Sequence, residues 1–249
     1  RCEKELSTQG FHLGLVTIFN ETNAQRAGAI TKMVKPTFKP RDASEWLVMG
    51  PHFYVATPLN KSARTVCGNN LQYDDNDLAV VPPDFLPRST FRPGDASGDL
   101  TEFRKAMRPW PNETSKRTFQ DWPKLAIRSQ WQTGNERSFV CALMPPGVTA
   151  VHAVKFVMCD SLRLLARLAG IASSLPGDFL VRFKGRGGVS YDDLASLPKV
   201  QSPLEEPLVA RVLRLNCLTK PYAEVWREAV PQNIADDTWT SDDGRLCST

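Results

Sequence analysis

The stretch Leu125–Val157, LAIRSQWQTGNERSFVCALMPPGVTAVHAVKFV, decides the fold. Two of its apolar runs, Leu125–Trp131 and Ser138–Met144, predict strands, and a glycine-containing connection of hairpin length joins them. The Pro-Pro-Gly sequence that ends at Gly147 predicts a turn. Alternating apolar residues over Val148–Val157 then predict a further strand.

Helical periodicity follows this stretch. Apolar residues between Asp160 and Leu175 recur at helical spacing; we expect Asp160 to cap the helix and Pro176-Gly177 to end it. The sequence Ser202-Pro-Leu-Glu combines an N-cap, a proline in the first turn and a capping-box glutamate, which predicts the start of a second helix. An apolar face predicts a third helix over residues 220–229.

The residues that precede Leu125 predict short strands and long loops. A strand is expected over Phe11–Asn20, and two short strands over Trp46–Thr57. The polar segment Asn60–Asp77 predicts a loop. Seven prolines between Pro82 and Pro123 exclude a long helix or a central strand there, although one short helix fits around Leu100–Met107.

Together these patterns predict an α+β fold. We expect a strand-rich part over residues 1–158, a helical part over 159–231 that completes the domain and acts as a spacer, and an acidic, irregular tail over 232–249. With 249 residues, 41% of them hydrophobic and 23% charged, the composition is that of a globular protein. The chain does not begin with Met, so we expect either a processed chain or a piece of a longer protein.

Cysteine use and hydropathy predict a cytoplasmic protein without a membrane span. The six cysteines form no CxxC pair, and Cys141 and Cys217 lie in apolar runs typical of a core. This usage fits a reducing compartment. No apolar run approaches the roughly 18 residues that a membrane helix needs.

The charge is distributed unevenly. The net charge is only +4, yet residues 23–41 contain five basic residues and no acid. Residues 103–128 contain seven basic residues against Glu113 and Asp121, whereas residues 236–243 are acidic. Such polarity predicts an anionic partner for part of the surface, and the alternative is a solvated basic face.

Sequence signatures of common catalytic sites are missing. The chain has three histidines and no G-x-S-x-G nucleophile turn, and no cysteine–histidine spacing fits zinc. There is no phosphate-loop motif; the stretch 185–188, Gly-Arg-Gly-Gly, resembles one only in being basic and glycine-rich. A magnesium nuclease motif is approached only by Asp99 with Glu102 and Arg104.

Aromatic residues interleave with the basic residues of 103–131, a pattern that suits phosphate contacts and base stacking. Trp110 lies between two prolines and beside Arg108, so we expect it to be the most exposed of these aromatic residues. Trp122 and Trp131 are expected instead to hold the loop against the core.

Seven segments carry a resemblance through their order along the chain: GPHFYVATPLNK (50–61), PDFLPR (83–88), CALMPPG (141–147), ASSLP (172–176), LASLP (194–198), LRLNCLT (213–219) and DDTWTS (236–241). In this order they resemble the region after the catalytic domain in large adenine-specific DNA methyltransferases. These are the fused, type IIG-like enzymes of restriction–modification and of phage-defence systems such as DISARM and BREX. The resemblance spans about residues 11–243. The order from ASSLP to LASLP also resembles the final elements of type I target recognition domains.

The motifs that such enzymes use for methyl transfer are not in this chain. There is no Phe-x-Gly-x-Gly-type loop for S-adenosylmethionine, and Val81-Pro-Pro-Asp84 lacks both the leading Asn or Asp and the aromatic residue of the adenine-positioning motif. The resemblance therefore implies a target recognition region without its catalytic domain. We expect no cofactor in this chain, S-adenosylmethionine in the catalytic domain, and no catalytic residues here.

The partners implied are double-stranded DNA, the catalytic domain of the same polypeptide and other proteins of a defence system. Sequence would be read in the major groove, with basic loops anchoring the backbone. From charge and expected loop position, the candidate DNA contacts are Asn60, Lys61, Arg64, Arg104, Lys105, Arg108, Lys116, Arg117, Lys184 and Arg186. The alternative is a protein-docking module that contacts DNA little.

Overall fold

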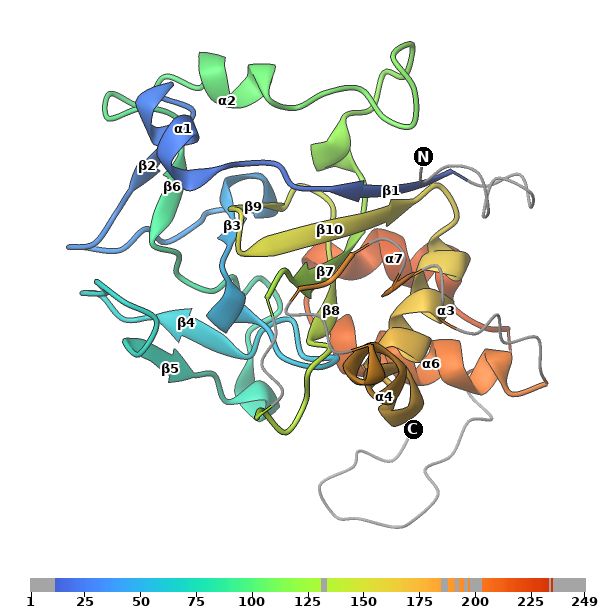
Figure 1. The fold of residues 1–249 in the computed structure, drawn as a ribbon. Coiled ribbons are helices and arrows are strands. Elements are labelled where there is room, and N and C mark those ends of the chain that lie inside the picture. The colour runs from blue at the N-terminus through green and yellow to red at the C-terminus, as the bar shows by residue number, and fades with distance from the viewer. Residues whose placement is uncertain are drawn as a thin grey trace.

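A four-stranded antiparallel sheet in the order β1-β10-β7-β8 lies at the centre of the protein (Figure 1). Its strands are β1 (Leu13–Val16), β7 (Lys124–Arg128), β8 (Cys141–Met144) and β10 (Val154–Cys159). The computed structural model describes residues 12–130, 134–184, 188–190, 193–194, 197, 203–232 and 234. The strands predicted before Asn20 and within 125–157 are confirmed, although Trp131 lies outside the described residues.

The sheet is buried on both faces because side chains alternate along each strand. Leu125 and Ile127 of β7 belong to one hydrophobic cluster, whereas Ala126, between them, belongs to another. In the same way, Leu143 of β8 faces the first cluster and Ala142 faces the second. The sheet therefore has a separate core on each side.

Helices cover the first face, which confirms an α+β fold with a helical C-terminal segment (Figure 1). They are α3 (Leu162–Ser173), α4 (Leu175–Phe183), α6 (Glu205–Asn216) and α7 (Ala223–Ala229). Polar contacts also join this layer to the sheet: the Asn216 side-chain oxygen accepts from the Leu143 N–H at 2.9 Å, and the Tyr222 hydroxyl donates to the Leu143 carbonyl at 3.1 Å. Cys141 and Cys217 are buried, as predicted.

The predicted ends of the first helix need correction. Ser161, not Asp160, caps α3, since its hydroxyl accepts from the Leu164 N–H at 3.3 Å. Pro176 does not simply end the helix but lies in the first turn of α4, where a missing N–H costs nothing. Ser174 caps this new helix by accepting from the Gly177 N–H at 3.1 Å. The expected cap at Ser202 lies outside the described residues.

Loops and short elements cover the second face of the sheet. Trp46, Phe53 and Leu59 pack there, and β3 (Leu47–Val48) pairs in parallel with β9 (Thr149–Ala150). The turn predicted at Gly147 is confirmed: its φ is +92°, and a Cβ there would lie 2.9 Å from the Ser44 nitrogen. Only one of the two strands predicted over 46–57 forms. A 3-10 turn, η3 (Gly50–His52), lies between them, and in place of the second strand residues 54–57 form a tight turn closed by an isolated bridge between Tyr54 and Thr57.

Four short elements enclose a third, small core at one side of the molecule. We call them the α1–β2 unit: α1 (Glu21–Arg26), β2 (Ile30–Lys32), β6 (Phe91–Pro93) and α2 (Thr101–Lys105). Phe19 and Phe103 stack in this core with ring centroids 5.5 Å apart, and Ile30 and Phe91 complete it. The short helix expected around Leu100–Met107 is thereby confirmed as α2.

The segment predicted as a loop over 60–77 is instead a hairpin, which we call the β4–β5 hairpin. It is formed by β4 (Lys61–Ala63) and β5 (Tyr73–Asp75). Only Ala63 and Tyr73 of these strands are buried, against Cys67, so the sequence lacks the apolar alternation that predicts strands. The remaining short turns are η2 (Ala43–Glu45), η4 (Leu78–Val80), η5 (Phe119–Asp121) and η6 (Lys220–Tyr222).

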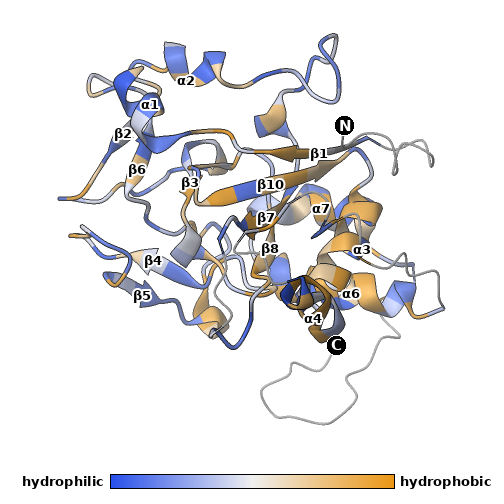
Figure 2. Ribbon diagram, in the orientation of Figure 1, coloured by the Kyte–Doolittle hydropathy of each residue, from blue (hydrophilic) through white to orange (hydrophobic). Residues whose placement is uncertain are grey.

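Hydrophilic and hydrophobic residues are segregated along this architecture. Figure 2 shows hydrophobic residues concentrated in the central sheet and in the helices packed on it, and hydrophilic residues over α1 and β5. In Figure 1 the α1–β2 unit and the β4–β5 hairpin lie on the side of the sheet away from α3, α6 and α7. Part of the exposed polar surface therefore lies opposite the helical layer.

Candidate nucleic-acid interface

The fold brings two segments that are distant in sequence together on this polar side. The chain after β2 runs beside the β4–β5 hairpin: Thr37 N–H donates to the Thr65 carbonyl at 2.9 Å, and Cys67 N–H donates to the Val34 carbonyl at 3.0 Å. The Arg88 guanidinium also donates to the Thr37 carbonyl, at 2.6 Å. The basic residues of 26–41 therefore lie next to those of the hairpin.

Three lysines on the first of these segments point into solvent. We call Lys32, Lys35 and Lys39 the lysine segment; all three are exposed, and none forms an ion pair within the described part of the chain. Burial raises the pKa of the Cys67 thiol, and the positive charges of Arg64 and Lys32 partly oppose that rise. Both charges therefore lie within electrostatic range of the same sulfur atom.

The candidate residues of the β4–β5 hairpin are largely engaged with acids. Lys61 lies on strand β4 rather than on a loop, and its ammonium group is 3.1 Å from an Asp75 carboxylate oxygen. Arg64 follows the strand and pairs with Asp74 at 2.8 Å. Asn60 accepts a backbone hydrogen bond from the Asn76 N–H at 3.0 Å. The hairpin is therefore closer to neutral than its basic residues suggested.

The second predicted group separates into free and engaged residues. Arg104, Arg108 and Lys116 are exposed, without an ion pair to another described residue. Lys105 is exposed but pairs with Glu102 on the same helix at 2.5 Å.

Arg117 has a structural role instead. Its guanidinium donates to the Asp121 carbonyl at 2.7 Å, forms an ion pair with Glu224 at 3.0 Å and lies 4.0 Å from the centre of the Trp122 ring. It thereby fastens the proline-rich segment to the C-terminal helices.

Trp110 is buried, so its predicted exposure was wrong. Only 7% of the residue is accessible, and its ring meets Trp122 edge-on with centroids 5.2 Å apart. A Cβ on Gly14 would lie 2.9 Å from the indole nitrogen of Trp110, so the ring packs directly on the backbone of β1. Trp122 is half-buried in the same stack and holds the loop, as predicted; Trp131 lies outside the described residues.

Two further basic residues of 103–128 are unavailable to a ligand. Lys124 is fully buried. Arg128 donates to the carbonyl oxygens of Gly50 and Phe53 at 3.0 and 2.7 Å, and burial lowers the pKa of its guanidinium. The predicted glycine-rich loop contributes little that can be described: Lys184 is the C-cap of α4 and lies 3.3 Å from Asp193, and Arg186 lies outside the described residues.

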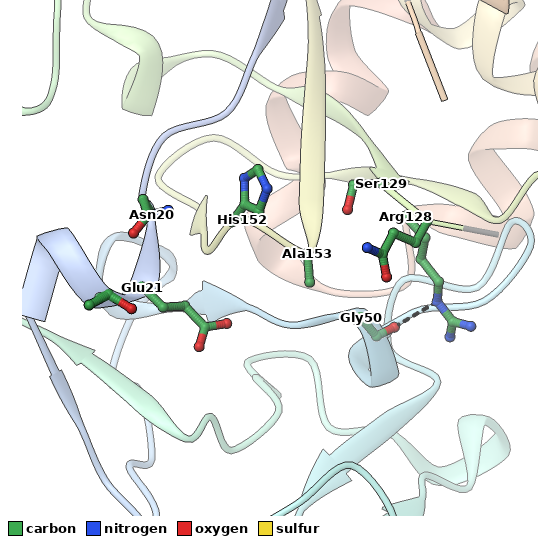
Figure 3. A pocket seen from close by; sticks show the side chains of 9 residues that line it. Asn20, Glu21, Gly50, Arg128, Ser129, His152 and Ala153 are labelled. Atoms are coloured by element: carbon green, nitrogen blue, oxygen red, sulfur yellow. Dashed lines mark hydrogen bonds between the residues drawn. The ribbon is translucent and has the colours of Figure 1, made fainter. Parts of the chain in front are cut away.

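Two cavities open on the polar side. One, of about 400 Å³, is lined by Arg41, Arg92 and Arg104 together with Glu45, which pairs with Arg41. The other, of about 340 Å³, lies between the start of α1 and the end of β7 (Figure 3). We call the second cavity the α1 pocket.

The lysine segment is the part of this surface that the DNA contacts predicted from the sequence did not include. Its signal was present, since residues 23–41 hold five basic residues and no acid. The α1 pocket had no comparable signal, because its walls come from residues near positions 21, 50, 130 and 152.

Metal-binding clusters and single helices able to span a membrane are both absent from the described part of the chain. Its His, Cys, Asp and Glu side chains form no group of three or more that could hold a metal ion. None of its single helices is long and apolar enough to cross a membrane; only the bent pair α3–α4, taken together, passes on length and composition.

The chain matches no protein-family model, no curated protein and no solved structure.

Proposed function

We propose that this chain recognises double-stranded DNA sequence-specifically, as the specificity region of an N6-adenine DNA methyltransferase. S-adenosylmethionine binding and methyl transfer would then belong to a catalytic domain outside this chain. The observation that carries the proposal is the lysine segment: three exposed, unpaired lysines beside the β4–β5 hairpin. Basic side chains on a polar face supply the phosphate contacts on which DNA affinity mainly depends.

Other exposed basic side chains without an ion pair to a described residue support the proposal that DNA binds on the side of the sheet opposite the helical layer. Arg26 on α1 and Arg104 on α2 are exposed in the α1–β2 unit, to which β2 with Lys32 also belongs. Arg108 and Lys116 are exposed further along the proline-rich segment, which Arg117 joins to α7. The opposite side of the sheet is occupied by the helical layer (Figure 1).

The test is binding of the chain to a labelled random duplex, followed by fluorescence anisotropy between about 50 and 200 mM salt. We expect affinity to fall steeply with salt, with a log–log slope of about −0.9 per phosphate contacted. Lys35→Glu/Lys39→Glu should weaken binding and make the slope shallower by about 2. The matched control, Lys220→Glu/Arg227→Glu, reverses two exposed charges on the helical side and should change neither quantity.

A protein-docking module is the second candidate, and the exposed side of α4 favours it. Leu175, Phe179 and Phe183 follow one another at a spacing of four residues and are 71%, 64% and 81% exposed. Exposed apolar patches commonly mark protein contacts. If the folded chain does not bind duplex DNA at about 50 mM salt, this candidate replaces the first.

A further inference from the structure

The α1 pocket has a rigid wall formed by the end of β7. The Arg128 guanidinium is fixed to the Gly50 carbonyl, and Figure 3 shows this contact at the edge of the pocket. Ser129 N–H donates to the Ala153 carbonyl at 3.0 Å, and the Ser129 carbonyl accepts from Val189 N–H at 3.2 Å. Side chains that project from this wall therefore start from a fixed backbone.

Three polar side chains of the pocket, one half-buried and two exposed, have no partner among the described residues. Glu21 lies on the α1 side, Gln130 on the β7 side, and His152 on the turn before β10. Among the described residues, none of these three side chains has a hydrogen bond or an ion pair. Asn20, by contrast, uses its side-chain oxygen to accept from the Asn23 N–H, which caps α1. A carboxylate, a carboxamide and an imidazole are thus available to a ligand.

The pocket lies between the two units that carry the candidate DNA contacts. Glu21 begins the helix that ends at the exposed Arg26. Burial raises the pKa of Tyr73 on β5 to about 12, and the charge of Glu21 contributes to that rise, so Glu21 lies within electrostatic range of the hairpin. Gly50, in the opposite wall, belongs to η3, which packs against β4.

A carboxylate in this position works against simple DNA affinity, because it repels phosphates along a basic surface. The first turn of α1 favours a carboxylate at Glu21, and a ligand that offers a hydrogen-bond donor can use this acceptor. In the major groove, the amino groups of cytosine and adenine are such donors, and glutamate and glutamine side chains are suited to them.

We propose that the α1 pocket reads one base of the target, by receiving the exocyclic amino group of a cytosine or an adenine. Glu21 accepts a hydrogen bond from that amino group, and Gln130 contacts the same base edge from the opposite wall. This inference rests on the proposed function and deepens it, since it assigns one specificity contact to named side chains outside the lysine segment.

The experiment selects preferred sites from a random duplex library with the full chain, and then measures affinity for the selected site with each of the four base pairs at every position. Glu21→Gln and Gln130→Ala are compared with Glu113→Gln, which changes an exposed carboxylate outside the pocket. Both pocket variants should lose preference at one shared position by about 5- to 150-fold. Their salt slopes should remain those of the parent chain, and Glu113→Gln should retain the full preference. Whether that position prefers cytosine or adenine identifies the base.

Two results would overturn the inference while leaving DNA binding intact: sites bound by the parent chain without base preference, or pocket variants that select the parent's sites with the parent's ratios. If the parent chain does not bind duplex DNA, the proposed function fails and the inference fails with it. Gln130 is outside α1, so the Gln130→Ala variant still tests the inference if Glu21→Gln disturbs the helix.

Discussion

The ammonium group of Lys124 is fully buried at the start of β7 and donates to the carbonyl oxygens of Gln120 and Trp122, at 3.0 and 2.5 Å. Burial lowers its pKa from 10.5 to about 7; the charge of Asp121 opposes this shift and that of Arg117 adds to it. The side chain thus holds the turn at η5 in place, and its burial there favours the neutral amine over the ammonium ion.

This shift predicts a pH-dependent stability. Between pH 7 and 10.5 the unfolded chain keeps the Lys124 proton whereas the folded chain loses it, so stability should rise with pH in this window. From pH 7 to 9 the gain should be about 2 kcal/mol, and Lys124→Met should abolish it. Urea unfolding of both proteins at each pH measures the difference.

The free energies of unfolding of the parent protein and Lys124→Met have to be compared at the same pH. The buried thiols make the stability of both proteins fall as pH rises, which is opposite to the effect of Lys124. Burial raises the pKa of Cys141 to about 12, so the unfolded thiol ionises first and stability falls at high pH. Lys116→Met, at an exposed position, should follow the parent protein throughout. Parallel curves for the parent protein and Lys124→Met would show that Lys124 keeps its proton when folded.

Single residues were the hardest feature to predict from the sequence. Lys124 and Arg117 contribute to the basic run of 103–128 as much as Arg108 does, yet only Arg108 of the three is free. Charge and local composition do not reveal which way a side chain points when the backbone is irregular. The exposure predicted for Trp110 was wrong for the same reason, because the ring packs on Gly14, almost a hundred residues earlier in the chain.

At the scale of elements, α4 combines a buried and an exposed apolar side. Val181 is fully buried in the core under the helical layer, and Asp178 accepts from the N–H groups of Ser138 and Phe139 at 2.8 and 2.6 Å. Phe179 and Phe183 stack on the outside with centroids 6.2 Å apart. The sequence did not predict this helix because Pro176-Gly177 was expected only to end the preceding one, whereas a proline in the first turn is also typical of a helix start.

The two sides of α4 should respond differently to substitution. Val181→Ser removes buried methyl groups and buries a hydroxyl, so it should lower the free energy of unfolding by about 2–4 kcal/mol. Phe183→Ser should lower it by less than about 1 kcal/mol, because the ring is already in solvent. Urea unfolding of both variants measures this. Equal losses would contradict the exposure of Phe183.

Elements with clear periodicity were predicted well. The strands β7, β8 and β10 and the helices α3, α6 and α7 all follow the expected segments, because burial on a regular element leaves its period in the sequence. The β4–β5 hairpin leaves no such pattern, since most of its side chains face water. The sequence indicated that the candidate interface is basic. It did not indicate where the basic side chains lie, because their positions depend on such polar, irregular segments.

At the scale of the whole molecule, the helical layer and the strand-rich part depend on one another. Leu125, Ile127, Leu143 and Val157 of the sheet lie in the same cluster as Leu165, Val209 and Val225 of the helices. The other face of the sheet is already covered by the segments around Trp46 and Phe53. Removal of the helices would therefore expose one complete apolar face.

A fragment of residues 1–160 should accordingly fail to fold as a soluble monomer, since exposed apolar surfaces of this size promote association. Co-expression with residues 161–249 should restore solubility, because the two pieces re-form the same core. Size-exclusion chromatography and near-ultraviolet circular dichroism of the two preparations measure this. A monomeric 1–160 fragment with the full chain's near-ultraviolet spectrum would mean that the second core alone sustains the fold, and that the proposed DNA-binding surface is independent of the helices.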